Sequence, residues 1–237
     1  MNTRFTVCRA ALACLAVLPL AALAKNDAAP ITDYLISAPV GQTDTTFTVG
    51  VAMGFSAGSV HTNVSGSSTV FERSEGLSGV LGEFNLGYAL AMPYHLYGAL
   101  GAFIDGRSNT AELETGASST SYTFRQKSVY GLTIAAGWHF DRGDMLYTKI
   151  GHSESNFERS GVQSAATGAN FHRVYRDSGL QYGLGFLMAA TPNAYWRYEY
   201  VTTPSFSEFS NATGGSTFKY KTTNSEFKLG WQYNIDA

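Results

Sequence analysis

Residues 46–55 read Thr46-Phe47-Thr48-Val49-Gly50-Val51-Ala52-Met53-Gly54-Phe55. Each odd-numbered position in this stretch carries a large apolar side chain, and each even-numbered position carries a small or polar one. A period of two is the pattern of a β-strand, because successive side chains point to opposite faces of the sheet. We therefore predict a strand here, with one apolar face and one face of small or polar residues.

The same alternation recurs seven times farther along the chain. In the last of these segments Phe227, Leu229 and Trp231 share one face, whereas Lys228 and Gly230 share the other. The seven further segments cover residues 80–90, 96–105, 122–140, 146–151, 180–188, 196–200 and 226–233. Eight alternating segments predict an all-β chain built from hairpins.

The connections between these segments alternate in length. Three of them are tight turns, at residues 92–95, 141–144 and 191–193. The other four, near residues 57–76, 107–120, 154–172 and 203–216, are long and rich in Gly, Ser, Thr and Asn. Short turns on one side and long loops on the other are typical of outer-membrane barrels. We therefore predict an eight-stranded antiparallel up-and-down transmembrane β-barrel with four long extracellular loops and three short periplasmic turns.

A water-soluble barrel would alternate as well, so the size of the side chains has to decide between the two. The interior of an eight-stranded barrel is narrow and is filled by its own side chains. Here the small and polar face suits such an interior, whereas the face with the bulky aromatic residues does not. The composition agrees, with 14% aromatic and only 14% charged residues and with 25 glycines. The apolar face is therefore predicted to face lipid.

The first 24 residues have the pattern of a secretory signal. Arg4 and Arg9 precede an apolar stretch that is too short to span a bilayer, and Ala22-Leu23-Ala24 matches a cleavage site before Lys25. Lipidation at Cys14 is the alternative. We predict cleavage between Ala24 and Lys25, a short periplasmic arm at residues 25–44 and a barrel domain at residues 45–237. The mature chain would have 14 basic and 18 acidic residues, which argues against nucleic acid as a partner.

Aromatic residues gather at one level of the predicted lipid-facing surface. Trp138, Trp196 and Trp231 each fall within a few residues of a predicted periplasmic end. Amphipathic rings collect at the boundary between membrane and water. The predicted periplasmic girdle comprises Tyr88, Trp138, Phe140, Trp196, Tyr198, Trp231 and Tyr233, and an outer girdle would comprise Tyr122, Phe124, Phe218 and Tyr220.

Charged residues on the small and polar face form the first candidate site. They are Glu83, Asp105, Arg125, Lys127, Lys149, Arg197, Glu199, Glu226 and Lys228. An unpaired charge inside a narrow barrel would cost several kcal/mol, so these groups are expected to pair. We interpret them as a structural network of ion pairs that plugs the lumen. The alternative is a gate in a narrow ion path.

The four-hairpin layout over residues 45–233 resembles the small outer-membrane β-barrel superfamily, which includes OmpA/OmpX-type and opacity-type proteins. The final strand, 226–233, resembles the signal by which the barrel-assembly machinery recognises such chains. The chain departs from that pattern because Asn234-Ile235-Asp236-Ala237 follow the last aromatic residue, Tyr233. The resemblance implies a Gram-negative outer membrane, with its lipid and lipopolysaccharide as partners. It implies little about activity, because the family includes adhesins, structural anchors and enzymes.

Two short motifs suggest functions that the predicted topology does not favour. His152, Ser153 and Glu154 suggest a hydrolase, but strand alternation points Ser153 away from the two others, and a nucleophile needs its base within hydrogen-bond reach. The integrin-type tripeptide 142–144 falls in a predicted periplasmic turn. Because the remaining histidines lack metal-ligand spacing, we expect no metal, and we expect no cofactor.

We predict a non-enzymatic surface barrel that acts in adhesion or envelope structure through its extracellular loops. Loops on a rigid scaffold often carry the function of such proteins. A host or cell-surface ligand would contact the loop bases, where the more plausible residues are Tyr122, Phe171, Tyr175, Phe206 and Phe209. The alternatives are a narrow low-conductance channel and, less favoured, an enzyme that modifies lipid A.

Overall fold

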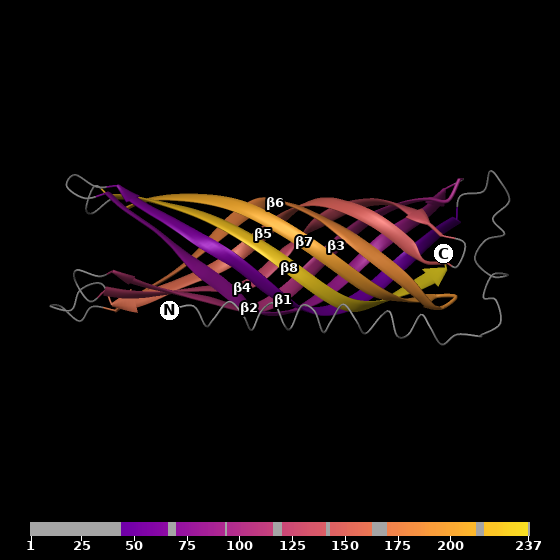
Figure 1. Cartoon of the computed structure of the whole chain (residues 1–237), viewed down its shortest axis with the longest axis horizontal. Coiled ribbons are helices and arrows are strands. Elements are labelled where there is room, and N and C mark those ends of the chain that lie inside the picture. The colour runs from indigo at the N-terminus through magenta and orange to yellow at the C-terminus, as the bar shows by residue number, and fades with distance from the viewer. Residues whose placement is uncertain are drawn as a thin grey trace, which may run out of the picture.

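The computed structural model describes residues 44–65, 70–92, 94–115, 120–140, 143–162, 170–211 and 216–236. It consists of eight strands and no helix in these ranges. The strands are β1 Asp44–Ser65, β2 Val70–Met92, β3 Leu96–Thr115, β4 Thr120–His139, β5 Met145–Val162, β6 Asn170–Thr191, β7 Ala194–Asn211 and β8 Ser216–Asp236. Each strand pairs antiparallel with its sequence neighbours, and β1 pairs with β8 (Figure 1).

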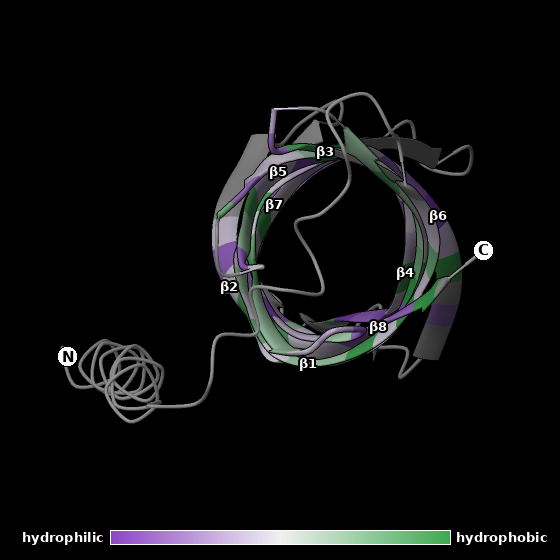
Figure 2. Cartoon of the chain, turned by 90° about the vertical axis from the view of Figure 1, so that its right-hand side faces the viewer, coloured by the Kyte–Doolittle hydropathy of each residue, from purple (hydrophilic) through white to green (hydrophobic). Residues whose placement is uncertain are grey.

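The pairing of β1 with β8 closes the sheet into a barrel. Viewed along its long axis, the barrel is a complete ring without a free edge (Figure 2). Closure satisfies the backbone N–H and C=O groups of every strand within the wall, which a structure in hydrocarbon requires. The predicted fold class, an eight-stranded antiparallel barrel with sequential strand order, is confirmed.

Three short turns join the strands at one end. Two residues connect β6 to β7, three connect β2 to β3, and five connect β4 to β5. In the β4–β5 turn Gly143 has a φ of 82°, a left-handed conformation that glycine adopts without the strain of a Cβ atom. This end is the predicted periplasmic one, and β8 also ends here (Figure 1).

At the opposite end the strands run much farther than predicted. The regions near 57–76, 107–120, 154–172 and 203–216 are largely strand, and only residues 66–69, 116–119, 163–169 and 212–215, outside the described residues, lie between strands there. The composition misled the prediction, because Ser and Gly are loop-forming in most settings. Here the backbone is instead paired on both sides, for example between Ala57 and Ser78.

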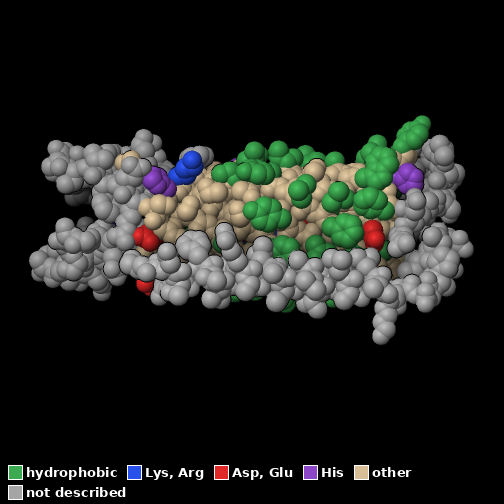
Figure 3. All heavy atoms as spheres, viewed as in Figure 1, with side chains coloured by type: hydrophobic (Ala, Val, Ile, Leu, Met, Phe, Trp, Pro, Cys, Tyr) green, Lys and Arg blue, Asp and Glu red, His purple; other side chains and the backbone are tan. Residues whose placement is uncertain are grey.

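An apolar belt surrounds the half of the barrel next to the short turns. Its most exposed side chains include Met53 at 71%, Leu132 at 68% and Leu100 at 59% exposure. In a space-filling view hydrophobic side chains cover the middle and right-hand part of the face, whereas basic side chains lie toward the left (Figure 3). A closed barrel with a lipid-facing belt of this kind spans an outer membrane.

The strands are about twice as long as the membrane requires. They have 18 to 23 residues, whereas a strand tilted at about 45° crosses a bilayer with roughly 9–11. The surplus lies above the belt, where the outward positions change to residues such as Ser59, Ser78, Ser108 and Asn156. We call this polar-faced upper part of the wall the extension.

None of the described segments is a helix that could cross a membrane.

One irregularity changes which residues of β4 face inward. The register between β4 and β5 shifts between Gln126 and Ser128, and the register between β3 and β4 shifts between Gly106 and Asn109. Inward positions on β4 therefore change parity around Lys127. A shift of one residue moves every later side chain to the other face. Gln126 and Val129 both point inward as a result.

Candidate functional site

A layer of charged side chains crosses the lumen at the level of the membrane. It comprises four acidic residues, Glu83, Asp105, Glu199 and Glu226, and four basic residues, Arg107, Lys149, Arg197 and Lys228. The exposed fraction of each of these eight side chains is at most 8%. The layer therefore carries no net charge when all eight groups are ionised.

Six of these residues form a chain in which positive and negative groups alternate. Its centre is Lys228, whose Nζ lies 2.5 Å from an oxygen of Glu83 and 3.0 Å from an oxygen of Glu226. Glu83 also accepts a hydrogen bond from Arg197 at 2.5 Å. Since every carboxylate in this chain has a cation on at least one side, the cost of removing it from water is offset.

The chain continues from Glu226 to Arg107 and ends at Asp105. Arg107 donates to Glu226 through one nitrogen, and its Nε and Nη2 lie 2.5 and 2.6 Å from the two oxygens of Asp105. A two-point contact of this kind fixes the plane of the guanidinium and is stronger than a single hydrogen bond. Arg107 is therefore held rigidly on the wall at β3.

The last two residues of the layer form a separate pair beside this chain. Lys149 Nζ lies 2.7 Å from one oxygen of Glu199, and the Tyr147 hydroxyl donates to the other oxygen at 2.5 Å. A cavity of about 60 Å³ lies between this pair, Glu83 and Arg197. A space of this size with polar walls holds a few water molecules at most.

Above these charges lies a second layer of polar side chains, which also contains one acid, Asp177, that accepts a hydrogen bond from Ser205 at 2.7 Å. Asn109 and Asn224 each donate to Oε1 of Gln126, at 2.9 and 3.1 Å. The Gln126 amide nitrogen in turn donates to Ser155 at 3.1 Å, and Asn109 also donates to Ser56. The sequence interpretation missed this layer, because it singled out ionisable side chains within the predicted strands, and Asp177 lies before the predicted strand at residues 180–188.

Two apolar clusters lie in the lumen on either side of the polar layers. The upper cluster comprises Val60, Leu77, Ala111, Phe124 and Phe157, with Tyr175 packed against it. The lower cluster comprises Ala89, Tyr97, Met145, Tyr147, Leu187 and Tyr195. Along β3 the order is Tyr97, Asp105, Arg107, Asn109 and Ala111, so the charges lie between the two clusters.

The structure places the nine predicted lumen charges on two different faces. Seven of them lie inside the barrel, but Arg125 and Lys127 are exposed on its outer face, so their assignment to the lumen network is wrong. The parity change on β4 is the cause. Arg107 takes part in the network instead, and the alternation could have found it because it lies two positions beyond Asp105.

The predicted periplasmic girdle lies on the outer surface near the short turns. Tyr88, Trp138, Phe140, Trp196 and Tyr233 are 41–48% exposed, whereas Tyr198 and Trp231 are partly covered. Trp196 and Trp231 are cross-strand neighbours whose rings meet edge to face, with centroids 4.8 Å apart.

In the proposed outer girdle, Phe124 is 1% exposed and belongs to the upper cluster, so that assignment is wrong. The same cluster takes up Tyr175, which is therefore unsuited to be a loop contact. The structure describes the backbone but not the side chains of Tyr122, Phe171, Phe206, Phe209, Phe218 and Tyr220. The predicted cleavage site, Ala24 and Lys25, lies outside the described residues.

The two short motifs lie in different parts of the barrel. His152 and Glu154 point outward, and Glu154 accepts a hydrogen bond from Tyr130, whereas Ser153 is buried in the lumen. Gly143 and Asp144 lie in the β4–β5 turn, where an oxygen of Asp144 accepts from the backbone of Ala189 at 3.0 Å; Arg142 lies outside the described residues. No group of three or more metal-ligating side chains occurs in the described ranges.

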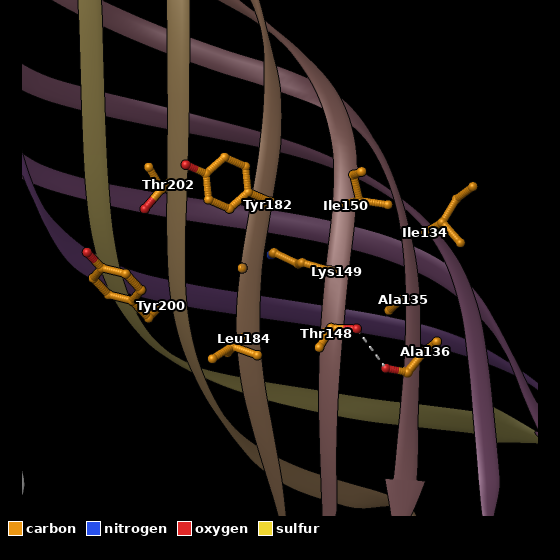
Figure 4. Close-up of a pocket in the computed structure, with 11 residues that line it drawn as sticks. Ile134, Ala135, Ala136, Thr148, Lys149, Ile150, Tyr182, Leu184, Tyr200 and Thr202 are labelled. Carbon is orange, nitrogen blue, oxygen red and sulfur yellow. Dashed lines mark hydrogen bonds between the residues drawn. The ribbon is translucent and has the colours of Figure 1, made fainter.

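The lipid-facing surface is hollowed between rows of side chains. One groove of about 490 Å³ lies between a row that comprises Ile134, Ile150 and Tyr182 and a second row that comprises Thr148, Leu184 and Tyr200 (Figure 4). Thr148 lies along it and donates to the Ala136 carbonyl at 3.4 Å. Such grooves follow from the pleat, because outward side chains of neighbouring strands line up into ridges.

Comparison with known proteins gives likeness in architecture alone. No family model and no curated protein matches the chain. Among solved structures, the attachment invasion locus protein Ail of Yersinia pestis is 15% identical with a TM-score of 0.39, over 78% of this chain and 98% of that one. The outer membrane protein OprG from Pseudomonas aeruginosa is 12% identical with a TM-score of 0.47, over 80% and 96%.

A third structure, the outer membrane protease OmpT from Escherichia coli, is 11% identical with a TM-score of 0.46, over 86% of this chain and all of that one. The names of the three proteins cover different activities. The likeness is one of barrel form.

Proposed function

We propose that this protein is a non-enzymatic surface barrel that holds a binding surface away from the outer membrane. The observation that carries the proposal is the extension, because all the strand length beyond the membrane requirement lies on one side of the belt. A barrel that served only as a membrane anchor would need strands of roughly 9–11 residues. The upper strand ends, between which the four connections run in sequence, therefore stand away from the membrane on the side where a ligand outside the cell could be contacted.

The interior of the extension supports a structural role for it. Phe124 and Phe157 pack with ring centroids 5.1 Å apart, and Phe157 stacks on Tyr175 at 5.8 Å. This apolar core lies in the part of the barrel that stands in water, where burial of apolar surface stabilises a fold most. The extension is therefore a rigid support for the connections that it carries.

Shortening the extension is expected to abolish surface attachment and leave the barrel assembled. The register gives one cut in each upper hairpin, at the pairs Ala57–Ser78, Thr110–Arg125, Asn156–Arg176 and Thr203–Asn224, each closed by an Asn-Gly turn. Cells that express the full chain or the shortened chain would be compared for attachment to immobilised matrix glycoproteins and to epithelial cells. Assembly would be followed by heat-modifiable migration in gels. Full attachment by the shortened barrel would contradict the proposal.

The channel alternative predicts a different measurement. Because apolar clusters lie above and below the charged layer, we expect the purified protein to give no conductance steps beyond those of lipid alone in a planar bilayer. The two apolar clusters in the described part of the lumen support this expectation. Stable, reproducible steps with the wild-type chain would favour the channel over the surface barrel.

We also propose that the protein catalyses no reaction. It is supported by the opposite directions of His152 and Ser153, since a base and its nucleophile must come within hydrogen-bond reach. It is also supported by the pairing of Glu154 with Tyr130, which commits the acid of this motif elsewhere.

A further inference from the structure

Cations gather on one outer face just above the apolar belt. Arg125 and Lys127 on β4 and Arg176 on β6 all point outward and are exposed. Among the described outward side chains of the other five strands at this height, Lys221 on β8 is the one Lys or Arg. Positive charge is therefore concentrated over β4, β5 and β6 at the boundary between membrane and water.

The carboxylates on this face are already engaged. Glu158 lies 2.8 Å from Nζ of Lys127 and also contacts His172. These two hydrogen bonds lower the pKa of Glu158 to about 2, so it stays ionised and bound to them. Glu154 accepts a hydrogen bond from the hydroxyl of Tyr130.

The two arginines of this face are not engaged in the same way. Among the described side chains, neither Arg125 nor Arg176 makes an ion pair within 4.0 Å. Two exposed guanidinium groups are thus available for an anion. A guanidinium matches the geometry of a phosphate group with two parallel hydrogen bonds.

An apolar groove crosses the belt below these arginines. It encloses about 640 Å³ and passes between the ridge of Leu132, His152 and Leu180 and the ridge below it, which includes Leu100 and Ile134. Leu180 lies four residues below Arg176 on the same face of β6, roughly 13 Å along the strand. The groove thus lies in hydrocarbon, and its upper end lies beneath the cations.

We propose that this face of β4, β5 and β6 binds one phosphorylated glycolipid of the outer leaflet, the class to which lipopolysaccharide belongs. An acyl chain lies in the groove, because only hydrocarbon is present at that depth. Arg176 binds the phosphate nearest the membrane, and Arg125, farther out on β4, binds a phosphate of the extended head group. This lipid site lies on the wall of the barrel and is separate from the rim to which surface attachment is assigned.

The proposal predicts a binding preference for phosphorylated lipid. Purified barrel in neutral detergent would be mixed with bisphosphorylated lipid A, with the same lipid after removal of its phosphates, or with inorganic phosphate. Native mass spectrometry would count the lipids retained. We expect about one bound lipid A per barrel and at least tenfold weaker retention of the dephosphorylated form, because each cation near an anionic lipid head group contributes roughly a fivefold gain in affinity and the site has two such cations. Equal retention of the two lipids would overturn the proposal.

Two pairs of variants separate the head-group contact from the acyl-chain contact. The double variant Arg125→Gln with Arg176→Gln is expected to weaken lipid A binding about tenfold to a hundredfold, whereas Lys221→Gln is expected to leave it unchanged. Ala102→Phe fills the groove and should also weaken binding, whereas the same substitution at the exposed Ala57 on β1 should not.

Equal effects of Lys221→Gln and of the double arginine variant would show attraction by overall charge and overturn the site. Competition by millimolar inorganic phosphate with no effect of Ala102→Phe would show a bare anion site and overturn the lipid assignment. All variants would first be shown to migrate as folded barrels, and the attachment assay is independent of every outcome here.

Discussion

Replacing Lys228 with methionine is expected to lower the free energy of unfolding of the barrel by about 3–5 kcal/mol. Lys228 is 1% exposed and joins Glu83 to Glu226 in the centre of the charged layer. Without it these two carboxylates face each other in the lumen, each with one arginine left. The measurement is urea unfolding of the protein in lipid vesicles, followed by tryptophan fluorescence.

Lys127 provides the matched control. It is also a lysine in an ion pair with a glutamate, but its side chain is 52% exposed. Lys127→Met is therefore expected to change the unfolding free energy by less than about 1 kcal/mol. Adding Glu226→Gln to Lys228→Met restores equal numbers of positive and negative groups in the layer and should recover at least half of the loss. A double variant as unstable as the single one would show that the loss comes from packing and not from charge.

Phe157→Ala is expected to cost about 3–5 kcal/mol, the usual range for removing a buried phenylalanine ring. Phe157 is 1% exposed and contacts both Phe124 and Tyr175 in the upper cluster. The loss should be local, because this cluster lies in the extension above the belt. Hydrogen exchange is the suitable measurement, since it resolves local opening from global unfolding.

In this variant exchange should rise in the upper halves of β4, β5 and β6 and stay low within the belt. Val174→Ala serves as the control, because Val174 is 65% exposed on the neighbouring strand and should change stability by no more than about 0.5 kcal/mol. Unchanged protection of the upper strands in Phe157→Ala would show that the cluster does not hold the extension together.

Much of this architecture could be predicted from local pattern. The alternation in residues 46–55 places Val51 and Met53 outside and Ala52 inside, as the structure has them. A barrel strand pairs with its sequence neighbours, so that local side-chain direction and turn length are sufficient to define the topology. The short turn at residues 191–193 follows from Pro192 and Asn193 in the same way.

Pattern failed where the wall departs from strict alternation or from the usual composition. The register shift at Lys127 cannot be recognised in the sequence, because a bulge adds a residue without changing residue type. Strict alternation through this position therefore assigned Phe124 to the outer face and Arg125 to the lumen, the reverse of the structure. The extension was taken for loops because it is rich in Ser, Thr and Gly, although pairing partners on both sides hold it as strand. The upper cluster brings together residues of distant strands, for example Val60 of β1 and Phe157 of β5, which no local pattern reveals.

The ion pairs of the charged layer join strands that are far apart in the order of synthesis. Arg107 and Glu226 are 119 residues apart in sequence, and Lys228 and Glu83 are 145 apart. These pairs form only when the last strand has met the first ones, so a half-built sheet released into lipid would expose unpaired charges to hydrocarbon. We therefore expect insertion and closure of this barrel to occur together, because an unfinished barrel in the bilayer would carry these charges without their partners.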